Sequence, residues 1–225
     1  MNLAAAAWLV FRKDLRIELR TGEILITTGF FALLITILTS LSFYLDDVVA
    51  RRIAPGVLWI SIAFSGVLAM GRSFQRERDH DAMRGLLLSP LPRPGIYLGK
   101  ALGIFAFLVL VEVLLVPLLS VLYHVDLGAV LGQITLITLL GTLGFSAAGA
   151  LFAAMGVRVR TKELVLSVVL FPLVSPALLA GVVATREVLA GASLSEINDW
   201  LRVLTAFDLT FLVLGALLFG PLTSE

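Results

Sequence analysis

Cysteine is absent from the 225 residues, histidine occurs twice, and charged side chains make up only 15% of the chain. The lack of cysteine excludes disulfides and thiolate metal sites, and it leaves the redox compartment open. The scarcity of charge is more informative, because soluble domains carry about 25% charged and about 45–50% apolar residues. Here 59% of the residues are hydrophobic. This apolar surplus predicts a protein whose surface faces lipid.

Six apolar runs are long enough to cross a bilayer, for which a helix needs about 20 residues. A helix also satisfies its backbone groups internally, as lipid requires. The predicted spans are 24–44, 53–70, 96–122, 131–155, 164–183 and 204–222. The last run contains Asp208, so only 209–222 is free of charge. We therefore predict an all-α, polytopic membrane protein with a single transmembrane domain over 1–225.

Basic residues are distributed unevenly between the two sides that these spans define. If the N-terminus is cytoplasmic, all but four of the 17 Lys and Arg residues fall on the inner side, the exceptions being Arg51, Arg52, Arg186 and Arg202. Because Lys and Arg stay preferentially on the cytoplasmic side of a membrane, both termini are expected in the cytoplasm.

Residues 1–22 predict an amphipathic helix at the inner membrane surface. One face is apolar and the neighbouring row is basic: Trp8, Phe11, Leu15 and Leu19 beside Arg12, Arg16 and Arg20. Such a helix would lie in the inner leaflet with its arginines on anionic head groups. The alternative is a solvated start to the first span. A secretory signal is not expected, because the apolar stretch is short and is followed by charges.

The connection between the second and third spans, 71–95, is rich in patterned charge. Acidic and basic residues alternate, an apolar patch follows, and Pro90, Pro92 and Pro94 end any helix there. A short charged helix with an apolar end is suited to docking a soluble partner; the alternative is a loop whose charges only mark the cytoplasmic side. The candidate docking residues are Arg72, Arg76, Glu77, Arg78, Asp79, Asp81, Arg84 and Leu86.

This connection also carries a family resemblance. The run RERDHDAMRGLLLSPLPRPGIYLGK, from Arg76 to Lys100, resembles the coupling-helix region of type-2 ABC exporter permeases, and most closely the haem exporter protein B (CcmB-type) family. Other similar pieces are FRKDLRIELR from Phe11, Ala54-Pro55-Gly56, Glu112 followed by Pro117, FPLVSPALL from Phe171, and Ala206-Phe207-Asp208. One departure is Asp79-His80-Asp81-Ala82, where the family pattern has an acidic residue followed by glycine.

The resemblance implies a permease subunit for haem export or haem-chaperone release in c-type cytochrome biogenesis, in the bacterial inner membrane. Implied partners are a second copy of this chain, two copies of a cytoplasmic ATPase, a haem-handling membrane subunit, a small membrane subunit and a haem chaperone. Haem would be cargo, ATP would be hydrolysed by the partner, and neither a bound cofactor nor nucleic acid is expected. The residues agree, because the nearest match to a phosphate-binding loop, Gly95 to Lys100, has three residues between its glycines instead of four.

Polar residues within the spans are candidates for a role in conformational coupling. Glu112 lies midway along the third predicted span, where a charge costs about 2.5–3.5 kcal/mol on insertion scales. It could instead bond a neighbouring helix across a kink at Pro117, and no second acidic residue is placed at its depth. Asp208 is expected near the outer end of the last span, within reach of water or Arg202. His124, also at the outer side, is a candidate haem ligand, although a hydrogen-bonded anchor is commoner at such a position; no metal site is predicted.

Small residues are dense in the fourth predicted span, where Gly144 with Ala148 and Ala150 with Ala154 have the spacing that lets helix backbones approach closely. We therefore expect this span to be buried. The stretch 185–201 is expected to form a short outer amphipathic segment. Two alternative functions remain open: a type-2 ABC permease for another amphiphile, or a proton-coupled secondary carrier that uses Glu112.

Overall fold

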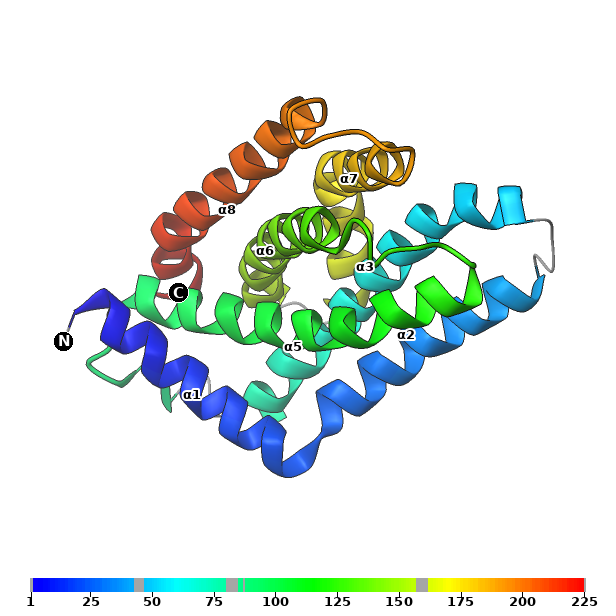
Figure 1. Cartoon of the computed structure of the whole chain (residues 1–225). Coiled ribbons are helices and arrows are strands. Elements are labelled where there is room, and N and C mark those ends of the chain that lie inside the picture. Colours follow the sequence, from blue (N-terminus) through cyan, green and yellow to red (C-terminus); the bar gives the residue numbers. More distant parts are fainter. Residues whose placement is uncertain (1, 43–46, 80–84, 87, 157–161, 225) are drawn as a thin grey trace.

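The computed structural model describes residues 2–42, 47–79, 85–86, 88–156 and 162–224. These residues form seven helices: α1 (Leu3–Thr21), α2 (Glu23–Ser42), α3 (Asp47–Asp79), α5 (Arg93–Leu122), α6 (Leu131–Gly156), α7 (Lys162–Leu189) and α8 (Asn198–Ser224) (Figure 1). All but α1 are long and apolar enough to cross a membrane. The prediction of an all-α protein with six spans is thus confirmed.

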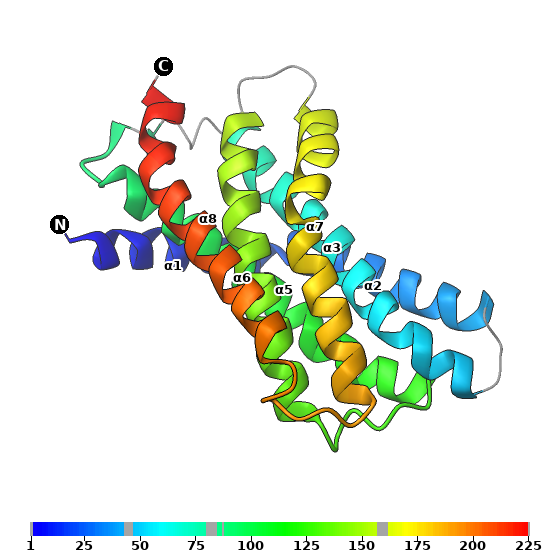
Figure 2. The ribbon, with the colours of Figure 1, turned by 90° about the horizontal axis from the view of Figure 1, so that it is seen from above.

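The first helix has well-defined ends. At its start, Asn2 accepts a hydrogen bond from the backbone N–H of Ala5, which satisfies a donor that the helix leaves open. At its end, Gly22 adopts a φ of +63°, a conformation that favours glycine, and its N–H donates to the carbonyl of Glu18. The chain then turns directly into α2, and α1 runs across the bundle while α6 and α8 run along it (Figure 2).

Helix α6 lies in the middle of the bundle, between α5, α7 and α8 (Figure 1). Of the six spans it has the largest buried share, 72%, so the prediction of a buried fourth span is confirmed. Its glycines explain the close packing, because a Cβ at Gly141 would lie 2.2 Å from the ring of Trp59 and one at Gly149 would lie 2.0 Å from Met70. Neither position has room for a side chain.

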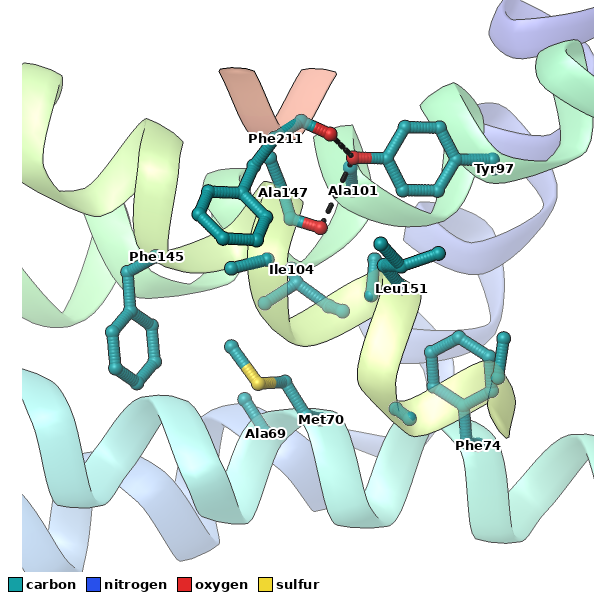
Figure 3. Close-up of a cluster of buried hydrophobic side chains, with 14 of the residues drawn as sticks. Ala69, Met70, Phe74, Tyr97, Ala101, Ile104, Phe145, Ala147, Leu151 and Phe211 are labelled. Atoms are coloured by element: carbon teal, nitrogen blue, oxygen red, sulfur yellow. Dashed lines mark hydrogen bonds between the residues drawn. The ribbon is translucent and has the colours of Figure 1, made fainter. Parts of the chain in front are cut away.

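The buried apolar side chains form two cores. The core shown in Figure 3 includes Met70, Phe145 and Tyr97. The hydroxyl of Tyr97 lies 3.0 Å from the carbonyl oxygen of Ala147 and 2.8 Å from that of Phe211. The other core surrounds Trp59. The indole N–H of Trp59 donates to the hydroxyl of Thr185 on α7 at 3.0 Å.

The helices differ from the prediction at two connections. Helix α3 continues beyond Met70 to Asp79, so the first part of the predicted 71–95 loop is helical. Helix α7 passes through Pro172 and Pro176 and ends at Leu189, and α8 begins at Asn198. The predicted outer amphipathic segment over 185–201 is therefore wrong: these residues are the end of one span, a turn and the start of the next.

The ends of the spans gather on two sides. The connections 123–130 and 190–197 lie together, at the opposite end of the bundle from the C-terminus (Figure 2). Because six spans separate the start of α2 from the end of α8, these two points share one side of the membrane.

Candidate functional site: a buried charged junction

Four charged side chains meet where α1 crosses α3 and α5, a group that we call the charged junction: Lys13 and Asp14 from α1, Glu77 from α3, and Lys100 from α5. The ammonium of Lys100 lies 2.6 Å from Oε1 of Glu77 and 2.9 Å from Oδ2 of Asp14. Lys13 lies 3.0 Å from Oδ1 of Asp14 and also bonds Oε1 of Glu77. Two cations and two anions therefore join three helices.

Three of the four side chains in the junction are withdrawn from solvent, and Lys13 is partly exposed. The exposed fraction is 1% for Lys100, 3% for Glu77 and 7% for Asp14, and the ammonium of Lys100 also lies 5.7 Å from the centre of the Phe74 ring. Buried charges are tolerated when they are paired, and removal of one partner typically costs about 3–5 kcal/mol. The balanced set thus fixes the positions of the three helices relative to one another.

Lys13 stays charged in this setting. Burial by itself would lower its pKa, but the carboxylates of Asp14 and Glu77 outweigh that effect, and the pKa is raised above its ordinary value of 10.5. Lys13 is therefore a cation throughout the physiological range of pH.

A second set of ionic contacts joins α1, α2 and α3 beside the junction. One oxygen of the buried Glu18 accepts the backbone N–H of Leu25 at 2.8 Å, and the other lies 3.1 Å from the guanidinium of Arg76. Arg76 also reaches Glu23 at 3.2 Å, and Arg72 reaches Glu23 at 3.4 Å. Glu18 therefore satisfies a donor at the start of α2 and binds the C-terminal part of α3.

Glycines on α5 bring α1 close enough for these contacts. A Cβ at Gly95 would lie 2.6 Å from the Cβ of Ala6, and a Cβ at Gly99 would lie 2.6 Å from the Cβ of Val10. Gly103 continues the four-residue spacing and faces Asp14. This spacing is the signal that could have identified the contact from the sequence, since small residues four apart permit close helix approach.

Two of the predicted docking residues are engaged in contacts within the chain. Glu77 is buried in the junction and Arg76 is held by acidic residues of α1 and α2, so the prediction that Glu77 faces a soluble partner is wrong. Arg72 is exposed. Leu86 is partly buried and packs against the core. The side chains of Arg78 and Asp79, and the residues Asp81 and Arg84, lie outside the described part of the chain.

The polar residues of the spans also have defined surroundings. Glu112 is 4% exposed and accepts a hydrogen bond from the hydroxyl of Thr142 on α6, so it bonds a neighbouring helix, while α5 continues through the exposed Pro117. Asp208 is also 4% exposed and lies against Gly144, near the middle of α6.

Asp208 was expected near Arg202, and His124 was a candidate haem ligand; the first expectation is corrected and the second stays a prediction. Arg202 pairs with Asp199 at 3.1 Å, and Asp208 lies deeper than predicted, so Arg202 does not neutralise Asp208. His124 is exposed in the turn after α5 with a φ of +48°. Within the described residues no three His, Asp or Glu side chains are grouped as a metal site would require; ligation of haem iron by His124 stays a prediction.

These features define a multi-pass helical membrane protein whose first helix is tied ionically to the end of α3 and the start of α5. The family model described as CcmB protein matches residues 5–221, and the chain belongs to this family. It is 27% identical to heme exporter protein B of Bradyrhizobium diazoefficiens over 92% of this chain and 91% of the relative. It is 32% identical to heme exporter protein B of Paracoccus denitrificans (80% and 82%) and 30% identical to that of Pseudomonas aeruginosa (92% and 89%).

Proposed function

We propose that this chain is the membrane permease subunit of an ABC transporter complex for haem export or haem-chaperone release in c-type cytochrome biogenesis. Support comes from the family match over residues 5–221 and from relatives that are named heme exporter protein B. The six apolar helices supply the membrane domain that such a subunit needs. Haem would be the cargo, or the complex would release a haem-loaded chaperone.

The proposed subunit works with an ATPase that docks on its inner end. Helix α3 leads directly into the segment 78–88, which contains most of the predicted docking residues. The charged junction is the observation that carries the mechanism, because it fastens the last turn of α3 to α1 and α5 through buried ion pairs. A displacement imposed on 78–88 would therefore move α1 and α5 together with α3. In this proposal ATP is bound and hydrolysed by the partner.

The proposed assembly is a homodimer of this chain with two ATPase copies, a haem-handling membrane subunit and a small membrane subunit, in the bacterial inner membrane. Both termini would be cytoplasmic. Because the chain contains no cysteine, a single introduced thiol reports position without background. A cysteine at Asp81 should be protected from an impermeant maleimide in intact spheroplasts, whereas one at Asp199 should be labelled. Labelling of position 81 from the outside would contradict the proposal.

Docking can be tested by co-purification of the ATPase subunit with charge-reversed permease. Reversal at Arg78, Asp81 and Arg84 should abolish co-purification, because these residues lie in the proposed docking segment. The matched control reverses the exposed pair Asp199 and Arg202 on the opposite side, which should leave co-purification unchanged. Equal recovery of the ATPase with both variants would refute docking at this segment.

Transmission through the junction needs a separate experiment. Glu77→Gln weakens the link between α3 and Lys100 but leaves 78–88 unaltered. We expect the variant to retain the ATPase while maturation of c-type cytochromes falls at least tenfold. Wild-type maturation with Glu77→Gln would show that the junction does not transmit motion, whereas loss of the ATPase would assign Glu77 to docking.

A further inference from the structure

Asp208 has the least satisfied side chain in the membrane interior. It is 4% exposed, and neither carboxylate oxygen has a hydrogen-bond partner of ordinary geometry. It lies against α6 at Gly144, where a Cβ would be 2.3 Å from Oδ1 and 2.7 Å from the ring of Phe207. The backbone N–H of Gly144 lies close to the carboxylate. Gly144 thus leaves the backbone of α6 bare at the point where the carboxyl group meets it.

No basic group compensates Asp208 among the residues that the structure describes. Helix α6 contains no titratable side chain. Among residues whose side chains the structure describes, the titratable and charged groups of the other helices packed on α8, and of α8 itself, are Arg93, Tyr97, Lys100 and Glu112 on α5, Arg186 and Glu187 on α7, and Asp199 and Arg202 on α8. Lys100 is held in the charged junction and Tyr97 bonds backbone carbonyls. An ionised Asp208 would therefore be buried without a counter-charge.

Glu112 occupies a comparable depth on the other side of α6. Its partner Thr142 is two positions from Gly144, which corresponds to about 3 Å along a helix. Glu112 and Asp208 thus flank the central helix near mid-span, although the sequence alone placed no second acid at this depth. They differ in one respect: the hydroxyl of Thr142 donates to Glu112, whereas no side chain among the described residues donates to Asp208.

We propose that Asp208 is a proton-binding site, and that the neutral, protonated acid allows α8 to pack against α6 at Gly144. A charged carboxylate without a counter-charge is expensive at this depth, and protonation removes that charge. Separation of α8 from α6 would expose Asp208 to water and release the proton. Movement at this seam is therefore linked to proton binding, independently of which cargo the complex handles.

The bound proton can be observed by infrared spectroscopy of the complex in lipid nanodiscs, with 13C-labelled aspartate. At neutral pH the wild type should show the carbonyl band of a protonated aspartic acid, with the isotope shift. Asp208→Asn should remove this band, and Asp199→Asn, which changes an exposed acid on the same helix, should leave it intact. The absence of a protonated aspartate band from the wild type, or its persistence in Asp208→Asn, would overturn the proposal.

A second measurement tests whether the proton holds the seam. Between pH 6 and pH 9 the thermal unfolding temperature of the wild type should fall by several degrees more than that of Asp208→Asn, because asparagine stays uncharged at both pH values. If both proteins change equally with pH, Asp208 does not hold α8 through a proton.

A double-mutant comparison tests the contact between Asp208 and Gly144. Gly144→Ala should lower the unfolding temperature of the wild type, and it should lower that of Asp208→Ala less, because the second substitution frees the space at Oδ1. Equal effects in both backgrounds would show that the two groups do not meet.

Discussion

Buried charge is compensated at the charged junction and left uncompensated in the middle of the bundle. At the junction, Lys13, Asp14, Glu77 and Lys100 neutralise one another across three helices. In the middle, Glu112 and Asp208 have no basic partner within the described residues, and only Glu112 has a hydroxyl donor. Ion pairs thus set the geometry of the surface helix, whereas uncharged hydrogen bonds and close packing hold the core of the membrane domain.

Loss of Lys100 should produce the largest effect. Lys100→Met leaves two buried carboxylates, Glu77 and Asp14, with only the partly exposed Lys13 to neutralise them, and we expect a loss of about 3–5 kcal/mol in the free energy of unfolding. The measurement is thermal unfolding of the purified complex in nanodiscs. Arg202→Met, which removes the cation of an exposed pair, should change stability by less than about 1 kcal/mol. Equal losses would show that the junction is solvated.

Widening the contact between α1 and α5 should have a smaller effect. The Cβ of Gly99→Ala would lie 2.6 Å from the Cβ of Val10 and 2.7 Å from the carbonyl oxygen of Ala7, so α1 must shift, at a cost of about 1–3 kcal/mol. Gly132→Ala is the control, because nothing lies within 4 Å of its Cβ and alanine favours a helix. A stability of Gly99→Ala equal to that of the control would contradict the close approach.

Loss of the hydrogen bond from Thr142 to Glu112 should lower the free energy of unfolding slightly less. Thr142→Val removes the bond to Glu112 while preserving shape, and leaves a buried acceptor unmet, for a loss of about 1–2 kcal/mol. Thr210→Val is the matched control, since Thr210 is exposed and bonds only the carbonyl of Ala206 on its own helix. A loss in the control as large as in Thr142→Val would mean that the change reflects threonine removal in general.

The titration of Lys13 should have the smallest effect. Its pKa is raised in the folded state, so its stabilisation is complete below the unfolded value near 10.5 and is lost as the pH rises through the higher folded value. Because about a third of the side chain is exposed, the contribution is about 1 kcal/mol or less. The free energy of unfolding, measured from pH 8 to 12, should fall more steeply in the wild type than in Lys13→Met. Parallel curves would exclude this linkage.

The sequence sufficed for features that depend on local pattern. Apolar length located the six spans, and small residues at four-residue spacing identified α6 as buried. The helical character of 1–22 was also predicted. On its predicted apolar face Trp8 (60%) and Leu19 (73%) are exposed, as side chains turned towards lipid would be, and Phe11 and Leu15 are partly buried. The side packed on α5 combines small residues with the acidic Asp14 and Glu18, which a search for apolar stripes cannot distinguish from a solvated face.

Pairings between distant residues could not be predicted. Lys13 and Glu77 are 64 positions apart, and charge order along the chain favours a docking role for Glu77 as readily as a buried one. The depth of Asp208 likewise depends on the register of α8 on α6, which tertiary packing determines. The start of α8 at Asn198, before the predicted 204, shifts the middle of that helix towards Asp208.

Tyr97 on α5 connects two other helices through one hydroxyl group. A phenolic hydroxyl carries one proton, yet two carbonyl oxygens on different helices, those of Ala147 and Phe211, lie 3.0 Å and 2.8 Å from it. Only one of them can receive a linear bond at a time. The hydroxyl of Tyr97 thus lies within bonding distance of both α6 and α8, and one side chain of α5 contacts the backbones of both helices.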